Sequence, residues 1–79
     1  MSNGWKFKRA IQDGVWHEIN GLNIWEHPWM KTGRTIVVQD PLYGQTFTMP
    51  VYEIAAGGVS ARFATTEFSN GVWGVYEEG

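Results

Sequence analysis

The sequence lacks cysteine altogether, has only three prolines and contains no long apolar run. A chain without cysteine has no disulfides and no thiolate ligands for a metal ion. No stretch approaches the roughly 20 apolar residues of a membrane helix, and the opening residues MSNGWKFK lack the apolar segment of a signal peptide. We therefore expect a soluble, cytoplasmic protein that has no membrane partner.

Motifs that carry chemistry are also missing. The sequence has no nucleotide-binding loop and no pattern that brings a nucleophile together with an oriented base. We therefore expect no enzymatic activity, no catalytic residues and no cofactor. If a substrate were found, His27 would be the preferred general base, because Trp25 and Trp29 beside it would remove water from its ring.

Aromatic residues are abundant in a short chain. The 79 residues include five Trp, four Phe and three Tyr. A chain of this length forms one small domain, covering residues 1–79, and folding buries only about 60–65% of the surface that the unfolded chain exposes. Each large aromatic side chain buries about 150–250 Å², so these residues are the obvious material for a core.

Turn signals divide the chain into short runs rich in β-branched and aromatic residues. Pairs such as Asp13-Gly14, Asn20-Gly21 and Asn70-Gly71 predict antiparallel strands joined by tight turns. The expected strands cover residues 5–11, 15–19, 22–26, 34–39, 45–54, 59–68 and 72–77, with a loop at 27–33. We predict an all-β antiparallel meander of about six or seven strands, curled or closed into an SH3-like or OB-like barrel.

Two strands in the second half carry further information. Residues 34–39 are β-branched and apolar enough for a central strand. The next strand contains Pro50, which cannot donate a backbone hydrogen bond and so predicts an edge, a bulge or a bend.

The segment NIWEHPWM, residues 23–30, belongs either to the apolar core or to a surface that binds a partner. A type I′ turn at Asn20-Gly21 pairs Ile19 with Leu22 and Trp16 with Trp25. The preceding turn at Asp13-Gly14 leaves two alternatives for the strand before it. A plain two-residue loop places the apolar residues of 5–11 on the tryptophan face, whereas a bulged loop places them on the opposite face.

We favour the bulged loop because it separates aliphatic from charged side chains. One face then carries Trp5, Phe7, Ile11, Val15, Ile19, Leu22 and Ile24, interrupted by Arg9, His17 and Glu26. The outer face and the loop after Pro28 carry the candidate partner-binding residues, which are Lys6, Lys8, Trp16, Trp25, His27 and Trp29. The alternative is that another part of the chain covers these tryptophans.

An exposed tryptophan cluster is an apolar patch that monomeric proteins seldom leave unused. We therefore expect a binding module for a protein or peptide partner. One alternative is single-stranded nucleic acid, bound by base stacking on tryptophan beside Lys6 and Lys8, although the net charge of −2 opposes it. Another alternative is a structural protein whose aromatic patch forms a homodimer interface.

Two histidines and two glutamates in the same hairpin resemble a set of metal ligands. The favoured register places His17 and His27 on opposite faces, so we expect no metal site. A three-residue loop at the Asn20-Gly21 turn would shift the pairing by one residue and bring the two histidines close together.

Overall fold

The computed structural model describes residues 4–41 and 43–78. Its elements are β1 (Trp5–Gln12), β2 (Glu18–Ile19), β3 (Leu22–Asn23), the 3-10 helix η1 (Ile24–Glu26), β4 (Met30–Gln39), β5 (Thr46–Ala56), β6 (Val59–Ser69) and β7 (Val72–Glu78). The predicted all-β antiparallel architecture is confirmed. The predicted loop at 27–33 is wrong in its second half, because β4 begins at Met30. No helix in the described ranges has the length and apolar character needed to cross a membrane.

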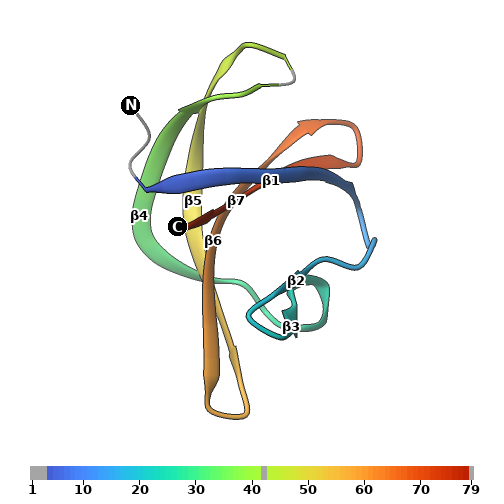
Figure 1. The fold of residues 1–79 in the computed structure, drawn as a ribbon, viewed down its shortest axis with the longest axis vertical. Helices are drawn as coiled ribbons and strands as arrows, with labels where there is room; N and C mark the ends of the chain where they lie inside the picture. The colour runs from blue at the N-terminus through green and yellow to red at the C-terminus, as the bar shows by residue number, and fades with distance from the viewer. Residues whose placement is uncertain (1–3, 42, 79) are drawn as a thin grey trace.

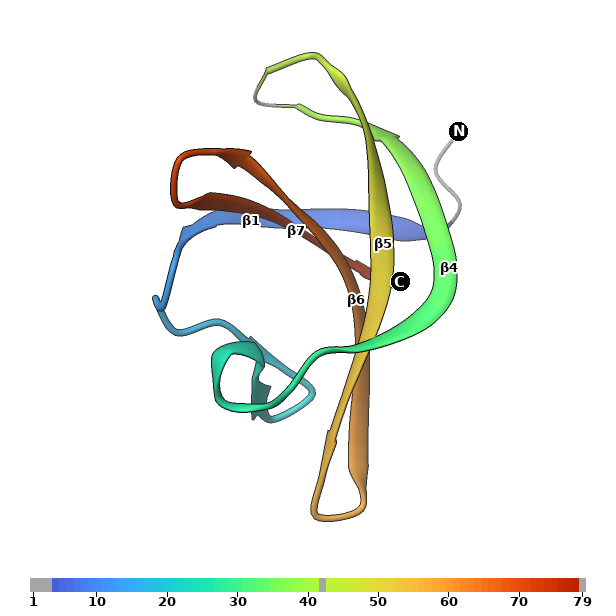
Figure 2. The same ribbon diagram turned by 180° about the vertical axis from the view of Figure 1, so that it is seen from behind.

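Five strands form one antiparallel sheet in the order β1-β7-β6-β5-β4, and β2 and β3 form a separate two-stranded ribbon (Figure 1). Strands β4 to β7 are consecutive hairpins, whereas β1 joins the sheet beside β7. The sheet curls strongly, so that β1 and β7 run in a direction crosswise to that of β4 and β5 (Figures 1 and 2). Within the described residues β1 and β4 are the outermost strands, and closure into a barrel stays a prediction.

The predicted hairpin between residues 5–11 and 15–19 is wrong. β1 pairs instead with β7, with Ile11 opposite Trp73, and the backbone N–H of Asp13 extends this pairing by donating to the carbonyl of Gly71 at 2.8 Å. β7 offers β1 a partner along its full length, whereas the segment after Asp13 supplies only the two residues of β2. The longer ladder forms, and residues 13–17 become a loop.

The sheet carries an apolar core on each face. The ribbon-side core consists of Ile11, Ile19, Ile24, Ile54, Ala61, Phe63 and Val75. The curl-side core consists of Trp5, Ile36, Met49, Val51, Ala64 and Tyr76. Neighbouring residues of one strand, such as Phe63 and Ala64, belong to different cores, which places the two cores on opposite faces. Residues 18–29 cover the first core, and the curl of the sheet encloses the second.

A β-bulge at Lys8 allows β1 to contribute to both cores. The register of β1 on β7 shifts between Phe7 and Arg9. The extra residue inverts the alternation of side chains, so Trp5 and Phe7 pack on the curl side and Ile11 packs on the ribbon side. The prediction that these three residues share one face is therefore wrong.

The irregularity predicted at Pro50 is confirmed. Pro50 lies opposite Thr35 of β4, beside a shift of register between Lys31 and Thr35. β5 pairs with β6 only from Val51 onward. The residue that lacks a backbone donor thus lies where the pairing of β5 changes.

Candidate functional site

The segment NIWEHPWM leaves the ribbon at Asn23, whose buried side chain caps η1. Its Oδ1 atom accepts hydrogen bonds from the backbone N–H of His17 at 3.2 Å and of Trp25 at 3.4 Å. A side chain that satisfies backbone donors in this way favours the start of a helical turn over a continued strand. The ribbon therefore ends after the pair Glu18 and Asn23, and the predicted cross-strand pair of Trp16 and Trp25 is wrong.

Trp25 and Trp29 form part of the wall of the ribbon-side core. The ring centroid of Trp29 lies 5.2 Å from that of Tyr52, 5.2 Å from that of Phe63 and 5.7 Å from that of Trp73. Its indole N–H donates to the carbonyl of Ile24 at 2.6 Å. Both tryptophans are half-buried. The predicted exposed cluster of three tryptophans is not formed, because the sheet covers two of them.

Trp16 is the exposed tryptophan of this region. Its side chain is 56% exposed, and that of its neighbour Val15 is 47% exposed. The carbonyl of Trp16 accepts a 2.6 Å hydrogen bond from Nη2 of Arg9, which holds the loop against β1. Lys6 and Lys8 are exposed on β1, and His27 is half-buried.

His17 is buried in a network that joins β1, the loop and β7. Arg9 Nε donates to His17 Nδ1 at 3.2 Å, and His17 Nε2 lies 3.3 Å from Glu77 Oε2. Because an arginine N–H only donates, Nδ1 must be the acceptor, which assigns the proton to Nε2 and makes it the donor to Glu77.

Burial and the neighbouring positive charges favour the neutral ring of His17. Burial lowers its pKa from the ordinary value of 6.5, the hydrogen bond to Glu77 opposes that change, and the positive charge of Arg9 adds to it. Both ring nitrogens are engaged, so His17 is not placed as a free general base. Among the described residues no group of three or more His, Cys, Asp or Glu side chains could hold a metal ion.

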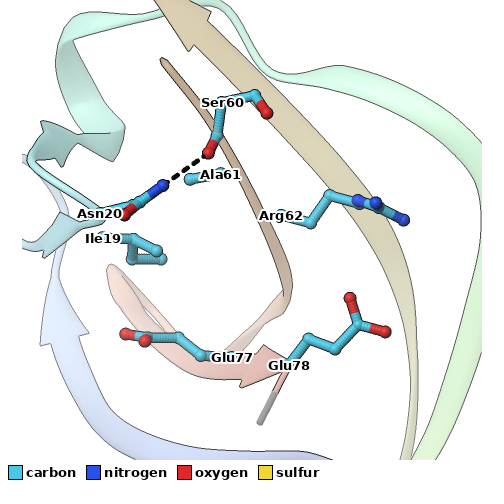
Figure 3. A pocket seen from close by; sticks show the side chains of 7 residues that line it. All are labelled: Ile19, Asn20, Ser60, Ala61, Arg62, Glu77 and Glu78. Carbon is cyan, nitrogen blue, oxygen red and sulfur yellow. Dashed lines mark hydrogen bonds between the residues drawn. The ribbon is translucent and has the colours of Figure 1, made fainter.

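A polar pocket with a volume of about 390 Å³ lies beside this network. It is lined by Ile19, Asn20, Ser60, Ala61, Arg62, Glu77 and Glu78 (Figure 3). Asn20 Nδ2 donates to the carbonyl of Ser60 at 2.9 Å and ties the ribbon to β6 across the rim. Small-molecule sites usually have apolar walls with a few converging polar groups, and this depression is mostly polar.

The two outer strands of the sheet have opposite character. The outer strand β1 carries Lys6, Lys8 and Arg9 along its length and is interrupted by a bulge. The regular part of the outer strand β4, Thr35–Gln39, has no charged residue and exposes 59% of Val37. The prediction of a central strand at 34–39 is therefore wrong in its position, although the composition is that of a central strand.

No family model, curated protein or solved structure matches this chain.

Sequence reasoning placed Arg9 and His17 on one face, and the structure brings them into contact. It missed Glu77, which lies 60 residues further along the chain. It also missed that β4 has a strand neighbour on one side only among the described residues. The absence of charge from Thr35 to Gln39 was the available signal, but nothing local shows that this strand has a partner on one side only.

Proposed function

We propose that this protein is a non-catalytic interaction module that binds an extended segment of a protein chain at the free edge of β4. The observation that carries the proposal is the position of Thr35–Gln39, an uncharged β-branched strand, at the outside of the sheet. An outer strand presents a row of unpaired backbone N–H and C=O groups, which is a template for one more strand.

The two outer strands differ in how they are protected against pairing with other chains. Natural sheets protect their outer strands with lysines and bulges, because an unprotected edge pairs with other chains. β1 has both kinds of protection, from Lys6 and Lys8 and from the bulge at Lys8. β4 has a shift of register between Lys31 and Thr35 and no such protection beyond it. An edge left open in a chain that protects the other edge is best explained by a partner.

The side chains of β4 define what the partner would contact. Ile36 is 5% exposed and belongs to the curl-side core, and Val38 packs against that core. Val37 lies on the outer face of the sheet, which is the face away from the curl-side core. Its cross-strand neighbour there is Thr48 of β5. A bound strand would place alternate residues against the rim of the curl-side core and beside Val37, which favours a neutral, β-branched segment.

Fluorescence anisotropy with a labelled peptide tests the proposal. The probe is fluorescein-Thr-Val-Thr-Val-Thr-amide, titrated with the wild-type protein and with Val37→Lys. Because an edge lysine opposes strand addition, we expect the variant to bind at least about tenfold more weakly, which is about 1.4 kcal/mol. Thr48→Lys is the matched control, since Thr48 is exposed on the same face one strand further in. Equal binding by wild type and Val37→Lys, or no binding at all, contradicts the proposal.

A second candidate function has its own observation. Trp16 is 56% exposed, and the nearby Lys8 is close enough to His17 to help lower the pKa of that ring. An exposed indole beside basic side chains is the combination that single-strand nucleic-acid binders use. Anisotropy of a labelled oligothymidylate at low salt would rise with wild type and not with Trp16→Ala if this surface binds nucleic acid.

A further inference from the structure

We infer that the segment bound at the edge of β4 is the same edge of a second copy of this chain. In this arrangement two β4 strands pair antiparallel about Val37 and join the two sheets into one. The inference rests on the proposed function, because it names the partner of the same edge.

The self-complementarity of Thr35–Gln39 supports this partner. An antiparallel pair centred on Val37 places Val37 opposite its own copy, Ile36 opposite Val38, and Thr35 opposite Gln39. Each apolar residue thus faces an apolar residue, and each polar residue faces a polar one. The stretch itself is uncharged, and the residues that flank it, Arg34 and Asp40, carry opposite charges. No like charges therefore face each other in this register.

The faces of the strand agree with the same register. Ile36 and Val38 both pack on the curl-side core, so their pairing would continue that core from one copy into the other. Thr35, Val37 and Gln39 alternate with them and share the outer face. The interface would therefore keep Ile36 and Val38 next to a core and place the polar pair of Thr35 and Gln39 beside Val37 on the other face.

Neighbouring registers fit less well. Centring the pair on Ile36 places Arg34 opposite Val38 and Thr35 opposite Val37. Centring it on Val38 places Ile36 opposite the buried carboxylate of Asp40. Both put polar or charged groups against aliphatic ones, so Val37 is the favoured centre. An edge without charged residues does not select an acidic or a basic partner strand. The β4 strand of a second copy is a neutral, β-branched segment and so fits this edge.

Sedimentation velocity with a charge exchange at Val37 tests the inference. We expect the mass of the wild-type protein to rise from monomer to dimer with concentration. Val37→Lys and Val37→Glu should each remain monomeric, because equal charges would meet at the centre of the pair. An equimolar mixture of the two variants should associate again, since lysine would then face glutamate. Thr48→Lys, with its change on the adjacent strand, should dimerise like the wild type.

Three results overturn the inference. The first is a wild-type protein that stays monomeric over the whole concentration series. The second is a dimer that persists in Val37→Lys, which would place the interface elsewhere. The third is a mixture of the two charge variants that does not associate. If the wild type is monomeric but binds the labelled peptide and loses it on Val37→Lys, the self-pairing fails and the proposed function stands. If neither dimer nor peptide binding is found, both fail.

Discussion

Gly74 in β7 is constrained by a side chain of the neighbouring strand. A Cβ atom at this position would lie 1.9 Å from Cζ of Phe68, far inside van der Waals contact. The Phe68 ring has little room to retreat, because its centroid lies 4.7 Å from that of Phe47 and 5.6 Å from that of Tyr43. Glycine is required here by the packing of the curl-side core.

We therefore expect Gly74→Ala to lower the free energy of unfolding by about 1–3 kcal/mol, the usual cost of overpacking. Urea denaturation measures this change. In a Phe68→Leu background the same substitution should cost less, since the ring that it meets is gone. Equal costs in the two backgrounds would mean that the ring is not the cause.

The buried ring of His17 predicts the sign of a pH dependence in the stability of the protein. Burial lowers the pKa of His17 in the folded state below the ordinary value of 6.5, so the unfolded chain binds more protons near that pH. The stabilisation is complete above the unfolded pKa and is lost as the pH falls below it toward the lowered folded pKa. Protonation also places a hydrogen on Nδ1, where Arg9 already donates.

Unfolding midpoints in urea, measured between about pH 7.5 and about pH 5.5, should therefore fall as the pH falls. His17→Gln keeps a neutral donor near Glu77 and should flatten this dependence. His27→Gln is the matched control for the loss of one histidine side chain. A wild-type protein with constant stability over this range would contradict the assigned state of His17.

At the scale of elements, residues 18–29 cover one face of the sheet, and the loop before them leaves Trp16 outside. We expect Trp29→Ala to lower the free energy of unfolding by about 3 kcal/mol. This is near the lower end of the cost for a buried aromatic residue, because Trp29 is only half-buried where it packs against several rings. Trp16→Ala should change the free energy of unfolding by no more than about 0.5 kcal/mol, as for other exposed positions. Chemical denaturation of both variants measures these changes. Equal losses of unfolding free energy would contradict the placement of Trp29 at the core and Trp16 on the surface.

The same segment shows what could be predicted from sequence. Asn20 and Gly21 adopt φ angles of 55° and 85°, as the type I′ turn requires, and Ile19 pairs with Leu22 as predicted. Turn chemistry is local, so the residues themselves specify it. The pairing of β1 with β7 is a contact between opposite ends of the chain, and the bulge at Lys8 arises only within that pair. Neither leaves a local signal.

At the scale of the whole molecule, the two outer strands make the fold asymmetric. Replacing Lys6 with threonine and Lys8 with valine would remove the charges that protect β1. We expect this double variant to self-associate more than the wild type, because a second edge becomes available for pairing. Light scattering at increasing concentration measures the effect. Ser60→Glu with Arg62→Thr, both on the inner strand β6, changes the net charge equally and should scatter like the wild type. Equal scattering by all three proteins would mean that these lysines do not protect the edge.

The most direct test of the central claim is residue-resolved amide hydrogen exchange, measured in a dilute and in a concentrated sample. If β4 is the edge at which the protein pairs with a second copy, exchange within Thr35–Gln39 will slow as concentration rises, while exchange within Trp5–Gln12 and around Trp16 will not change. If exchange slows in β1 or around Trp16 and does not slow in β4, the claim is contradicted. The binding surface would then lie at the tryptophan and lysine residues of the first strand and the loop after it.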